Sequence, residues 1–384
     1  MSAKTGGLSP RAAVSQMATG YWISQAVRTM AILGLADHLA SGPRTAAELA
    51  EETGAHAPSL ARLLRTLVAL GLCERADAGG VYLTPLGEAM RSDVPDSARS
   101  FVLFITAPWV ERGWEDLPQA VRTGEPTFPR VHGVGFWDYL GAHPEEGALF
   151  DAAMSGGASA RAEALRAARE LSSIGTVVDV GGGQGRLLAT LLKAVPGLRG
   201  VLLDRPEVVA GAEAMLQAEG VADRCVVAEG DFFAAVPQGG DAYILAQIVH
   251  DWPDAEALAI LSACRQAMAP GARLCVIEQV LPSTDGSDLH EKAGPNLLDL
   301  NMLVLFGGGQ ERTAEEYRRL LVAAGFGEIQ VLPTDTLWSV VEAVAHLVLA
   351  TPGTIVQGSD IRNPCRRTSQ NPVKRKFNFA EHLF

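Results

Sequence analysis

Apolar residues recur three or four positions apart near the start of the chain, which predicts packed helices there. Residues 15–40 follow this spacing, and their candidate buried stripe comprises Ile32, Leu33, Leu35 and Leu39. Thr45 is followed three residues later by Glu48, a pair that forms a capping box at the start of a helix. We therefore expect a second helix over 45–53 that ends at Gly54.

A third helix, opening near Pro58, and two short strands complete a pattern typical of winged-helix folds. The helix would bury Leu60, Leu63, Leu64 and Leu67, and the strands are expected at 72–75 and 81–83. Winged helices often bind DNA, but this helix carries only Arg62 and Arg65 as basic groups and the flanking sequence is acidic. Because phosphate binding needs a basic face, we favour packing against another subunit over DNA binding.

The predicted secondary structure changes along the rest of the chain, from helices to alternating helices and strands. Residues 95–165 are predicted to be helical and rich in aromatic side chains, with breaks at 123–129 and 141–144. Beyond about residue 171, helical stretches alternate with short β-branched runs at 176–180, 200–203, 225–228, 242–246, 273–278 and 328–331. This alternation predicts an α/β fold with a doubly wound parallel sheet.

Composition and charge narrow the class of protein. Of the 384 residues, 48% are hydrophobic and 20% are charged, which is enough apolar mass for a core and too much for a disordered chain. Lys and Arg total 32 against 44 Asp and Glu, and the net charge of -12 argues against a nucleic-acid partner. The chain has no signal-peptide h-region and no apolar stretch of the roughly 18 residues that a membrane span needs. We expect a cytoplasmic protein without a membrane partner.

The cysteines, the histidines and the end of the chain add three expectations. Five cysteines are scattered without CxxC spacing, so no disulfide framework or zinc ribbon is predicted. The eight histidines form no HxxxH or His-plus-carboxylate cluster along the sequence, and we expect no metal. The last 39 residues, from His346, carry six basic and two acidic side chains. Their composition favours a disordered or loosely attached tail over a basic tether.

A glycine-rich turn between a buried strand and a helix is the sharpest motif. The strand ends at Asp179, glycines follow at 181, 182, 183 and 185, and a helix begins near Arg186. Such glycines permit positive φ angles and let backbone N–H groups approach a ligand at a helix N-terminus. The G-x-G-x-x-G dinucleotide fingerprint fails, because Arg186 and Leu188 occupy its third glycine position. The remaining G-x-G-x-G favours S-adenosylmethionine over NAD, and over a packing turn without a ligand.

Acidic residues follow the next two predicted strands. Asp204 lies nineteen residues after Gly185, at a strand end where a carboxylate can chelate a ribose diol. Asp231, in the sequence EGDFF, could accept the adenine amino group while Phe232 stacks on the ring. The alternative for Asp231 is a helix N-cap. Since open α/β sheets bind ligands at the carboxyl ends of their strands, we expect these positions to converge on one site.

A histidine with acidic neighbours follows the fourth predicted strand. His250 lies in AYILAQIVHDWPD, Glu278 closes the apolar run RLCVIEQVLP, and Glu311 follows the glycines of FGGGQERT. A lone histidine at a strand end is more often structural, but both glutamates are expected at the same edge of the sheet. A carboxylate on an imidazole N–H fixes its tautomer and stabilises the imidazolium. This grouping makes His250 a candidate general base.

The ordered motifs DVGGGQG, LLDRPEVV, GDFF, HDWPD, VIEQVLP and GGGQERT resemble those of the S-adenosylmethionine-dependent O-methyltransferases of small aromatic hydroxyls. This is the plant phenylpropanoid and bacterial polyketide family, of caffeate and hydroxyindole type, and the resemblance covers about residues 15–345. It implies a Rossmann-like doubly wound seven-stranded sheet, as in class I methyltransferases. The implied parts are a winged-helix-like dimerisation domain (1–95), a helical linker lining the acceptor pocket (96–170), a cofactor-binding catalytic domain (171–345) and an atypical tail (346–384).

The resemblance also implies a role for each site residue. His250 would be the general base, flanked by Glu278 and Glu311. The cofactor would be held by Asp179, Gly181, Gly183, Asp204, Arg205, Gly230, Asp231, Phe232, Ala246 and Gln247. The acceptor pocket would be lined by Phe150, Met154, Asp251, Met302 and Phe306. Ala246 stands where this family often has a lysine that contacts the cofactor, so that contact is absent or is replaced by backbone or by Gln247.

The implied activity is methyl transfer from S-adenosylmethionine to a phenolic or polyketide-type hydroxyl of a small aromatic molecule in secondary metabolism, carried out by a homodimer. Two other functions are compatible with this architecture. Proteins of this architecture can retain S-adenosylmethionine as a structural cofactor and hydroxylate or decarboxylate an aromatic polyketide, which the intact His250 with its two glutamates disfavours. A ligand-responsive regulator with its winged helix on DNA is disfavoured by the acidic net charge.

Overall fold

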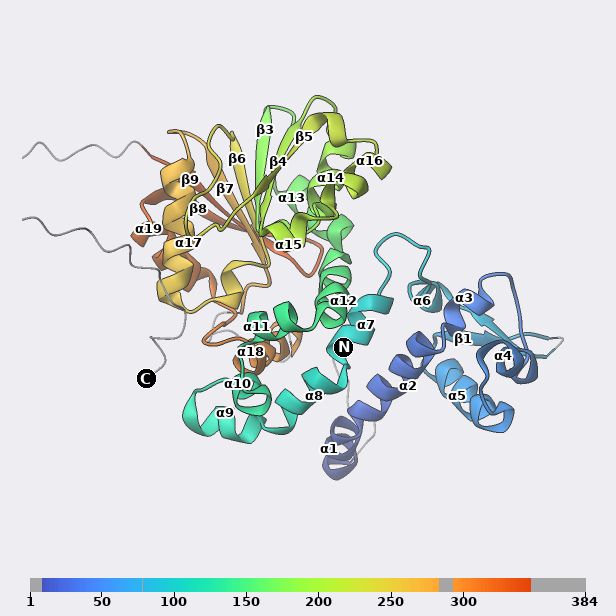
Figure 1. Ribbon diagram of the computed structural model, residues 1–384. Coiled ribbons are helices and arrows are strands. Elements are labelled where there is room, and N and C mark those ends of the chain that lie inside the picture. The colour runs from blue at the N-terminus through green and yellow to red at the C-terminus, as the bar shows by residue number, and fades with distance from the viewer. Residues whose placement is uncertain (1–8, 78, 283–292, 347–384) are drawn as a thin grey trace, which may run out of the picture. The chain divides into compact units, whose positions relative to one another are not determined.

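The computed structural model describes residues 9–77, 79–282 and 293–346 (Figure 1). Of the tail expected from His346 onward, only His346 itself is among the described residues. Cys365 lies outside them. The other four cysteines are free thiols. Among the described helices, none is long and apolar enough to cross a membrane.

The N-terminal region combines short helices with a two-stranded wing. Its helices are α1 (Pro10–Ala18), α2 (Gly20–Ile32), α3 (Leu35–Leu39), α4 (Ala46–Thr53), α5 (Ala57–Ala69) and α6 (Pro85–Glu88). The strands β1 (Cys73–Arg75) and β2 (Val81–Leu83) pair antiparallel, as the sequence predicts. The hydroxyl of Thr45 accepts a hydrogen bond from the N–H of Glu48, and the Glu48 carboxylate accepts one from the N–H of Thr45. The expected capping box is therefore confirmed at the start of α4.

One predicted core position in this region is wrong. Leu35 and Leu39 are buried, but Ile32 keeps 55% of its surface exposed. The apolar spacing over 15–40 shows no break, whereas α2 ends at Ile32 and Gly34 adopts a left-handed φ of 60° before α3 begins. This turn resets the helical phase, so the buried positions become Met30, Ala31 and Leu35.

A second helical region carries the aromatic side chains that the sequence concentrates there. It contains α7 (Arg99–Ile105), α8 (Pro108–Glu115), α9 (Leu117–Thr123), α10 (Thr127–His132), α11 (Phe136–Ala142), α12 (Pro144–Ser155) and α13 (Ala158–Ala168). The predicted breaks coincide with the ends of α9 and α11. Phe136 lies 4.7 Å from Phe306, ring centroid to ring centroid, just beyond α18 (Ala293–Leu305). Segments far apart in the sequence thus share one aromatic cluster.

The remaining strands form a seven-stranded sheet in the order β5-β4-β3-β6-β7-β9-β8. Its members are β3 (Thr176–Val180), β4 (Arg199–Asp204), β5 (Cys225–Glu229), β6 (Ala242–Ala246), β7 (Arg273–Glu278), β8 (Phe326–Pro333) and β9 (Ser339–Ala345). The first five are parallel, and β9 pairs antiparallel with both β7 and β8. The α/β prediction is confirmed, and β9 is the strand that the local pattern did not reveal. The strand order reverses beside β3, which is where such sheets place their ligand crevice.

Helices cover both faces of this sheet, as Figure 1 shows. On one side lie α17 (Asp254–Ala267) and α19 (Ala314–Ala323), and their apolar side chains share a core with β6 and β7. On the other side lie α13, α14 (Arg186–Ala194) and α16 (Ala212–Ala218). The shorter pieces are α15 (Pro206–Val209) and two 3-10 turns, η1 (Ala222–Arg224) and η2 (Val249–Asp251). The proposed domain boundaries at 95, 170 and 345 stay predictions.

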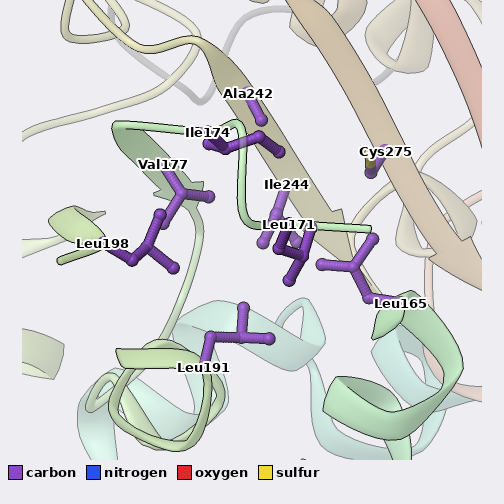
Figure 2. A pocket seen from close by; sticks show the side chains of 9 residues that line it. All are labelled: Leu165, Leu171, Ile174, Val177, Leu191, Leu198, Ala242, Ile244 and Cys275. Atoms are coloured by element: carbon purple, nitrogen blue, oxygen red, sulfur yellow. The ribbon is translucent and has the colours of Figure 1, made fainter. Parts of the chain in front are cut away.

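A small void lies in the second of these cores, and Figure 2 shows the side chains around it. Its volume is about 10 Å³. The lining side chains are Leu165, Leu171, Ile174, Val177, Leu191, Leu198, Ala242, Ile244 and Cys275. A buried water needs at least this much space and two or more polar partners. The void is therefore a dry packing defect and not a ligand site.

Candidate active site

The glycine-rich turn lies between the end of β3 and the start of α14. Gly181, Gly183 and Gly185 adopt left-handed φ angles of 71°, 60° and 83°. A Cβ atom on Gly182 would lie 2.6 Å from Cγ of Asp179 and 2.5 Å from Leu202. The chain can follow this path only with glycine, and the result is a bare backbone turn at a helix N-terminus. Such a turn fits a nucleoside that approaches the backbone closely.

Asp204 ends β4 and points back to the glycine turn. Its Oδ2 accepts a hydrogen bond of 2.8 Å from the N–H of Gly183, and its Oδ1 accepts one of 2.8 Å from the N–H of Arg205. Burial raises the pKa of this carboxyl, whereas the two backbone donors lower it. The N–H of Gly230, after β5, donates to the backbone carbonyl of Asp204. The ends of β3, β4 and β5 are thereby tied together at one edge of the sheet.

Asp179 is buried at the end of β3, and neither carboxylate oxygen has a hydrogen-bond partner among the described residues. Burial, together with the nearby charge of Asp204, raises its pKa to about 7, and Arg161 opposes this shift. An unpaired buried carboxyl is costly unless a further group binds it. Its position below the glycine turn fits a ligand or a water at the crevice.

Arg161 is a site residue that the sequence analysis missed. It belongs to α13, is 7% exposed, and donates from Nη1 to Oε1 of Gln247 and from Nη2 to the carbonyl of Met154, both at 2.7 Å. Burial lowers its pKa, while Asp179 and Glu278 raise it. The helix ASARAEALRAA carries two arginines among its alanines, and nothing in the sequence marks Arg161 as the buried one. The structure thus brings a buried cation beside Asp179 and Gln247.

The other expected cofactor residues lie after β5 and at the end of β6. The ring of Phe232 adjoins the glycine turn, since a Cβ on Gly181 would lie 3.4 Å from it. Asp231, by contrast, turns its carboxylate to the N–H of Phe233 at 2.9 Å and contacts none of the other predicted site residues through a hydrogen bond. Ala246 ends β6 beside Ile277 of β7, and Gln247 adopts a left-handed φ of 57°. This strained turn aims the Gln247 side chain at Arg161.

His250 lies in η2, directly after β6, and is only 4% exposed. Its Nδ1 lies 2.6 Å from Oε1 of Glu311 and 3.6 Å from Oε2 of Glu278. A carboxylate only accepts hydrogen bonds. Nδ1 of His250 therefore carries a hydrogen and donates a hydrogen bond to Glu311. The other ring nitrogen, Nε2, lies 3.4 Å from Oδ1 of Asp251. The structure therefore brings together the three residues that the sequence singled out, and leaves Nε2 as the nitrogen that can take a proton.

Hydrogen bonds of backbone N–H groups fix the carboxylate of Glu278 and the main chain of Glu311. Oε1 of Glu278 accepts hydrogen bonds from the N–H groups of Ile248 and Val249, at 3.2 and 3.0 Å. The N–H of Glu311 donates to Asp299 at 2.9 Å. Oε2 of each glutamate is buried and has no hydrogen-bond partner within the described part of the chain. Each carboxylate therefore keeps one oxygen available to the imidazole region.

The charges of this cluster are strongly coupled. Burial lowers the pKa of His250, but Glu278, Glu311 and Asp251 outweigh burial and hold it well above the ordinary 6.5. Burial raises the pKa of Glu278 to about 8 and that of Asp251 to about 7, against the opposing effect of His250. Strongly shifted pKa values on an imidazole and two adjacent acids are typical of catalytic acid–base sites.

The cluster also corrects one inference from the sequence. No His-plus-carboxylate cluster was found along the chain, yet folding brings one ligand atom each from His250, Glu278 and Glu311 within 4.8 Å of one another. Three such groups could hold a metal ion. The short hydrogen bond from Nδ1 to Glu311 shows that the same atoms also satisfy each other as an acid–base pair.

The expected acceptor residues meet beside this cluster. Met302 and Phe306 are buried, and both share a core with Phe150 and Met154 of α12. The ring of Phe150 lies 5.6 Å from that of Trp137, which in turn lies 6.5 Å from the ring of Trp252, nearly parallel to it. Trp252 follows Asp251 by one residue, so the aromatic cluster reaches the turn that carries His250.

Comparisons with known proteins identify the family. Residues 15–93 match the O-methyltransferase dimerisation domain and residues 114–327 the O-methyltransferase domain. A phenazine O-methyltransferase of Lysobacter antibioticus is 41% identical over 85% of this chain and 94% of its own length. An aclacinomycin 10-hydroxylase of Streptomyces purpurascens is 36% identical over 78% of this chain and 80% of its own.

One similar solved structure contains S-adenosylmethionine together with an aromatic molecule. It is an O-methyltransferase from neocarzinostatin biosynthesis in complex with S-adenosylmethionine and 2-hydroxy-5-methyl naphthoic acid. It is 39% identical to this chain, covers 84% of it and 96% of its own length, and superimposes with a TM-score of 0.66. The chain therefore belongs to the O-methyltransferase family and is an S-adenosylmethionine-dependent O-methyltransferase with the dimerisation domain of that family.

Proposed function

We propose that His250 is the general base of a methyl transfer to a hydroxyl on a small aromatic secondary metabolite. The observation that carries this proposal is the buried triad in which His250 donates from Nδ1 to Glu311 at 2.6 Å, with Glu278 at 3.6 Å. Glu311 fixes the tautomer, and Nε2 is then left to accept the hydroxyl proton.

The carboxylates around His250 reduce the energy needed for this proton transfer. A phenol of pKa about 10 and an ordinary imidazole of pKa about 6.5 differ by roughly 5 kcal/mol for complete transfer in water. Since Glu278, Glu311 and Asp251 hold the pKa of His250 well above 6.5, the gap is smaller in this site. The imidazolium that forms is neutralised by carboxylates already in place.

We propose that the glycine turn and the strand ends around it hold S-adenosylmethionine. When bound, this cofactor supplies an electrophilic methyl group on a sulfonium. Asp204 would bind the ribose, and Asp231 and Phe232 would bind the adenine. The backbone of Gly181 and Gly183 would contact the nucleoside directly. Asp179, Arg205, Gly230, Ala246 and Gln247 would complete this site. Ala246 cannot supply the positive charge of the lysine that this family often has at that position. The buried Arg161, near Asp179, supplies a cation that could bind the carboxylate of the cofactor.

The acceptor would lie between the aromatic cluster and the turn of His250. Phe150, Met154, Met302 and Phe306 supply an apolar lining, and Asp251 is the polar group next to Nε2. Such a lining suits a flat aromatic ring with a hydroxyl directed at the base. The neocarzinostatin relative, which holds a hydroxynaphthoic acid, supports a substrate of this class.

We further propose a homodimer formed through the N-terminal helices. A run of large apolar side chains on α1 and α2 is exposed, comprising Val14, Met17, Tyr21, Trp22 and Ile23. An exposed apolar patch of this kind marks an interaction surface. It lies within or beside the segment that matches the dimerisation domain.

The hydroxylase-type alternative has one point in its favour, the similarity to an aclacinomycin hydroxylase. In hydroxylation or decarboxylation the methyl group stays on S-adenosylmethionine, and no base is needed at an acceptor hydroxyl. The intact His250–Glu311 pair therefore disfavours this alternative. Methyl addition to product is the property that separates the two reactions.

The proposed function is tested by incubating the enzyme with S-adenosylmethionine carrying a labelled methyl group and a panel of phenols, naphthols and hydroxyphenazines. We expect mass spectrometry to find products heavier by one labelled methyl. His250→Gln should lower kcat by about two to four orders of magnitude and leave cofactor affinity in calorimetry near that of the wild type. Full turnover in this variant would remove His250 from the mechanism, and products heavier by oxygen would favour hydroxylation.

A further inference from the structure

Arg312 is a buried cation that the proposed mechanism does not use. It is 1% exposed and is the largest of the fully buried side chains in the described chain. Burying a guanidinium is costly unless hydrogen bonds replace its water. Its partners therefore indicate what the fold gains from it.

The guanidinium of Arg312 binds the turn that carries His250. Nη1 donates to the carbonyl of Val249 at 2.9 Å, and Nη2 donates to the carbonyl of Trp252 at 2.8 Å. Nε and Nη2 both donate to Oδ1 of Asp254, at 3.0 and 2.9 Å. The carbonyls on both sides of His250 are thus held by one rigid, planar group.

The neighbouring residues of Arg312 approach the same turn. The N–H of Gln310 donates to the carbonyl of His250 at 2.8 Å. A Cβ atom on Gly309 would lie 2.8 Å from that carbonyl oxygen and 2.9 Å from the carbonyl oxygen of Asp251. Both obstacles are backbone atoms that cannot rotate away, so the approach requires glycine at 309.

Glu311 lies inside this same segment, between Gln310 and Arg312. The distance of 2.6 Å from its carboxylate to Nδ1 of His250 therefore depends on how closely the segment is held to the turn. We propose that Arg312, with Gly309, is a positioning residue that clamps the Glu311 segment onto the His250 turn and so sets the geometry of the base. This inference rests on the proposed role of His250.

A residue that only stabilised the fold would leave the chemistry of the folded enzyme unchanged. A positioning residue acts instead on kcat and on the titration of His250. The charged groups that face this imidazole are Glu278 at the end of β7, Glu311 in the clamped segment and Asp251 in its own turn. Loosening the clamp moves Glu311 away and leaves the other two in place.

The test compares Arg312→Met with the wild type at a temperature at which both are folded. We expect kcat to fall about 10- to 100-fold, because small misplacements of catalytic groups cost that much, while the KM for S-adenosylmethionine stays near the wild-type value. The low-pH limb of the kcat profile should move to lower pH, since His250 loses part of the negative charge that raises its pKa. Arg312→Lys should recover little, because an ammonium cannot span both carbonyls.

Two matched controls separate positioning from stability. Arg318→Met makes the same substitution at an exposed arginine of α19, which pairs with Glu315, and should leave kcat and its pH profile unchanged. Leu198→Ala removes a buried side chain at the void and should lower Tm, with kcat and pH profile retained at permissive temperature. If Arg312→Met fails to fold, Gly309→Ala perturbs the same contact and is expected to give the same loss of kcat.

A spectroscopic measurement keeps this test independent of turnover. In protein labelled with ¹³C at Cε1 of histidine, the His250 signal, assigned by its loss in His250→Gln, should titrate at lower pH in Arg312→Met than in the wild type. An unchanged titration of His250 with unchanged kcat in the folded variants would overturn the clamp, whatever happens to Tm. Absence of methyl transfer by the wild type would instead overturn the proposed function, and the titration would still decide on the clamp.

Discussion

At the scale of single residues, the unusual feature is the amount of negative charge around one imidazole. Glu278, Glu311 and Asp251 surround His250, and all four side chains are buried. Their net effect raises the pKa of His250 well above 6.5, although burial opposes it. A base accepts a proton only when it is neutral, so kcat should decrease as the pH falls through this raised pKa. The low-pH limb of the kcat profile is therefore expected above the pH at which an ordinary imidazole loses its proton.

Replacing Glu311 by Gln tests this balance of charges. The amide oxygen can still accept the hydrogen bond from Nδ1, so the tautomer is kept, but one negative charge is lost. The pKa of His250 then falls, and the low-pH limb of the kcat profile moves to lower pH. The plateau of kcat should decrease about tenfold or more, since the imidazolium is less stabilised.

The measurement is kcat against pH with saturating cofactor and acceptor. Glu315→Gln is a suitable control. Glu315 lies four residues after Glu311, and its carboxylate is exposed and pairs with Arg318. Its profile should match that of the wild type. A low-pH limb that stays in place in Glu311→Gln would show that Glu311 does not tune the base.

At the scale of elements, the cofactor site depends on a turn whose path excludes side chains. Gly182→Ala would place a methyl group 2.6 Å from Cγ of the buried Asp179 and 2.5 Å from Leu202. Overpacking of this kind costs about 1–3 kcal/mol, and the turn must move to relieve it. We expect a lower Tm and at least tenfold weaker binding of S-adenosylmethionine in calorimetry, since the same backbone faces the cofactor.

Gly211→Ala is the matched control for this substitution. Gly211 precedes α16 with a φ of -97°, and a Cβ there meets nothing within 4 Å. Its Tm and cofactor affinity should stay those of the wild type. Wild-type affinity in Gly182→Ala would mean that the turn tolerates a side chain and that the cofactor does not depend on its path.

The elements also show what the sequence could reveal. The glycine turn, Asp204, His250 and Glu278 were predicted because each lies at or just after the end of an apolar strand, and parallel strands bring their carboxyl ends to one edge. Glu311 lies between α18 and α19, and its signal was the glycine run before it. Arg161 and Arg312 escaped prediction, since their importance comes from partners 86 and 63 positions away. Ile32 was misplaced because the spacing of apolar residues does not reveal a left-handed turn at Gly34. Strand β9 lies between β7 and β8 and pairs antiparallel with both, an arrangement that the alternation of helices and parallel strands does not predict.

At the scale of the whole molecule, the exposed apolar run on α1 and α2 is a candidate interaction surface. Trp22 and Tyr21 keep 62% and 65% of their surfaces exposed, although aromatic side chains of this size stabilise interfaces most when buried. The dimerisation-domain match covers both residues. A second copy of this chain is the occupant that we propose for this surface.

Trp22→Glu places a charge in the proposed interface. We expect light scattering after size-exclusion chromatography to give twice the chain mass for the wild type and a large shift to monomer for the variant, because a buried unpaired charge is strongly unfavourable. Leu337→Glu charges another apolar side chain, 76% exposed and remote in sequence from α2. This control should remain dimeric. A wild-type protein that is monomeric at micromolar concentration, or a Trp22→Glu variant that dimerises as tightly as the control, would contradict an interface at this surface.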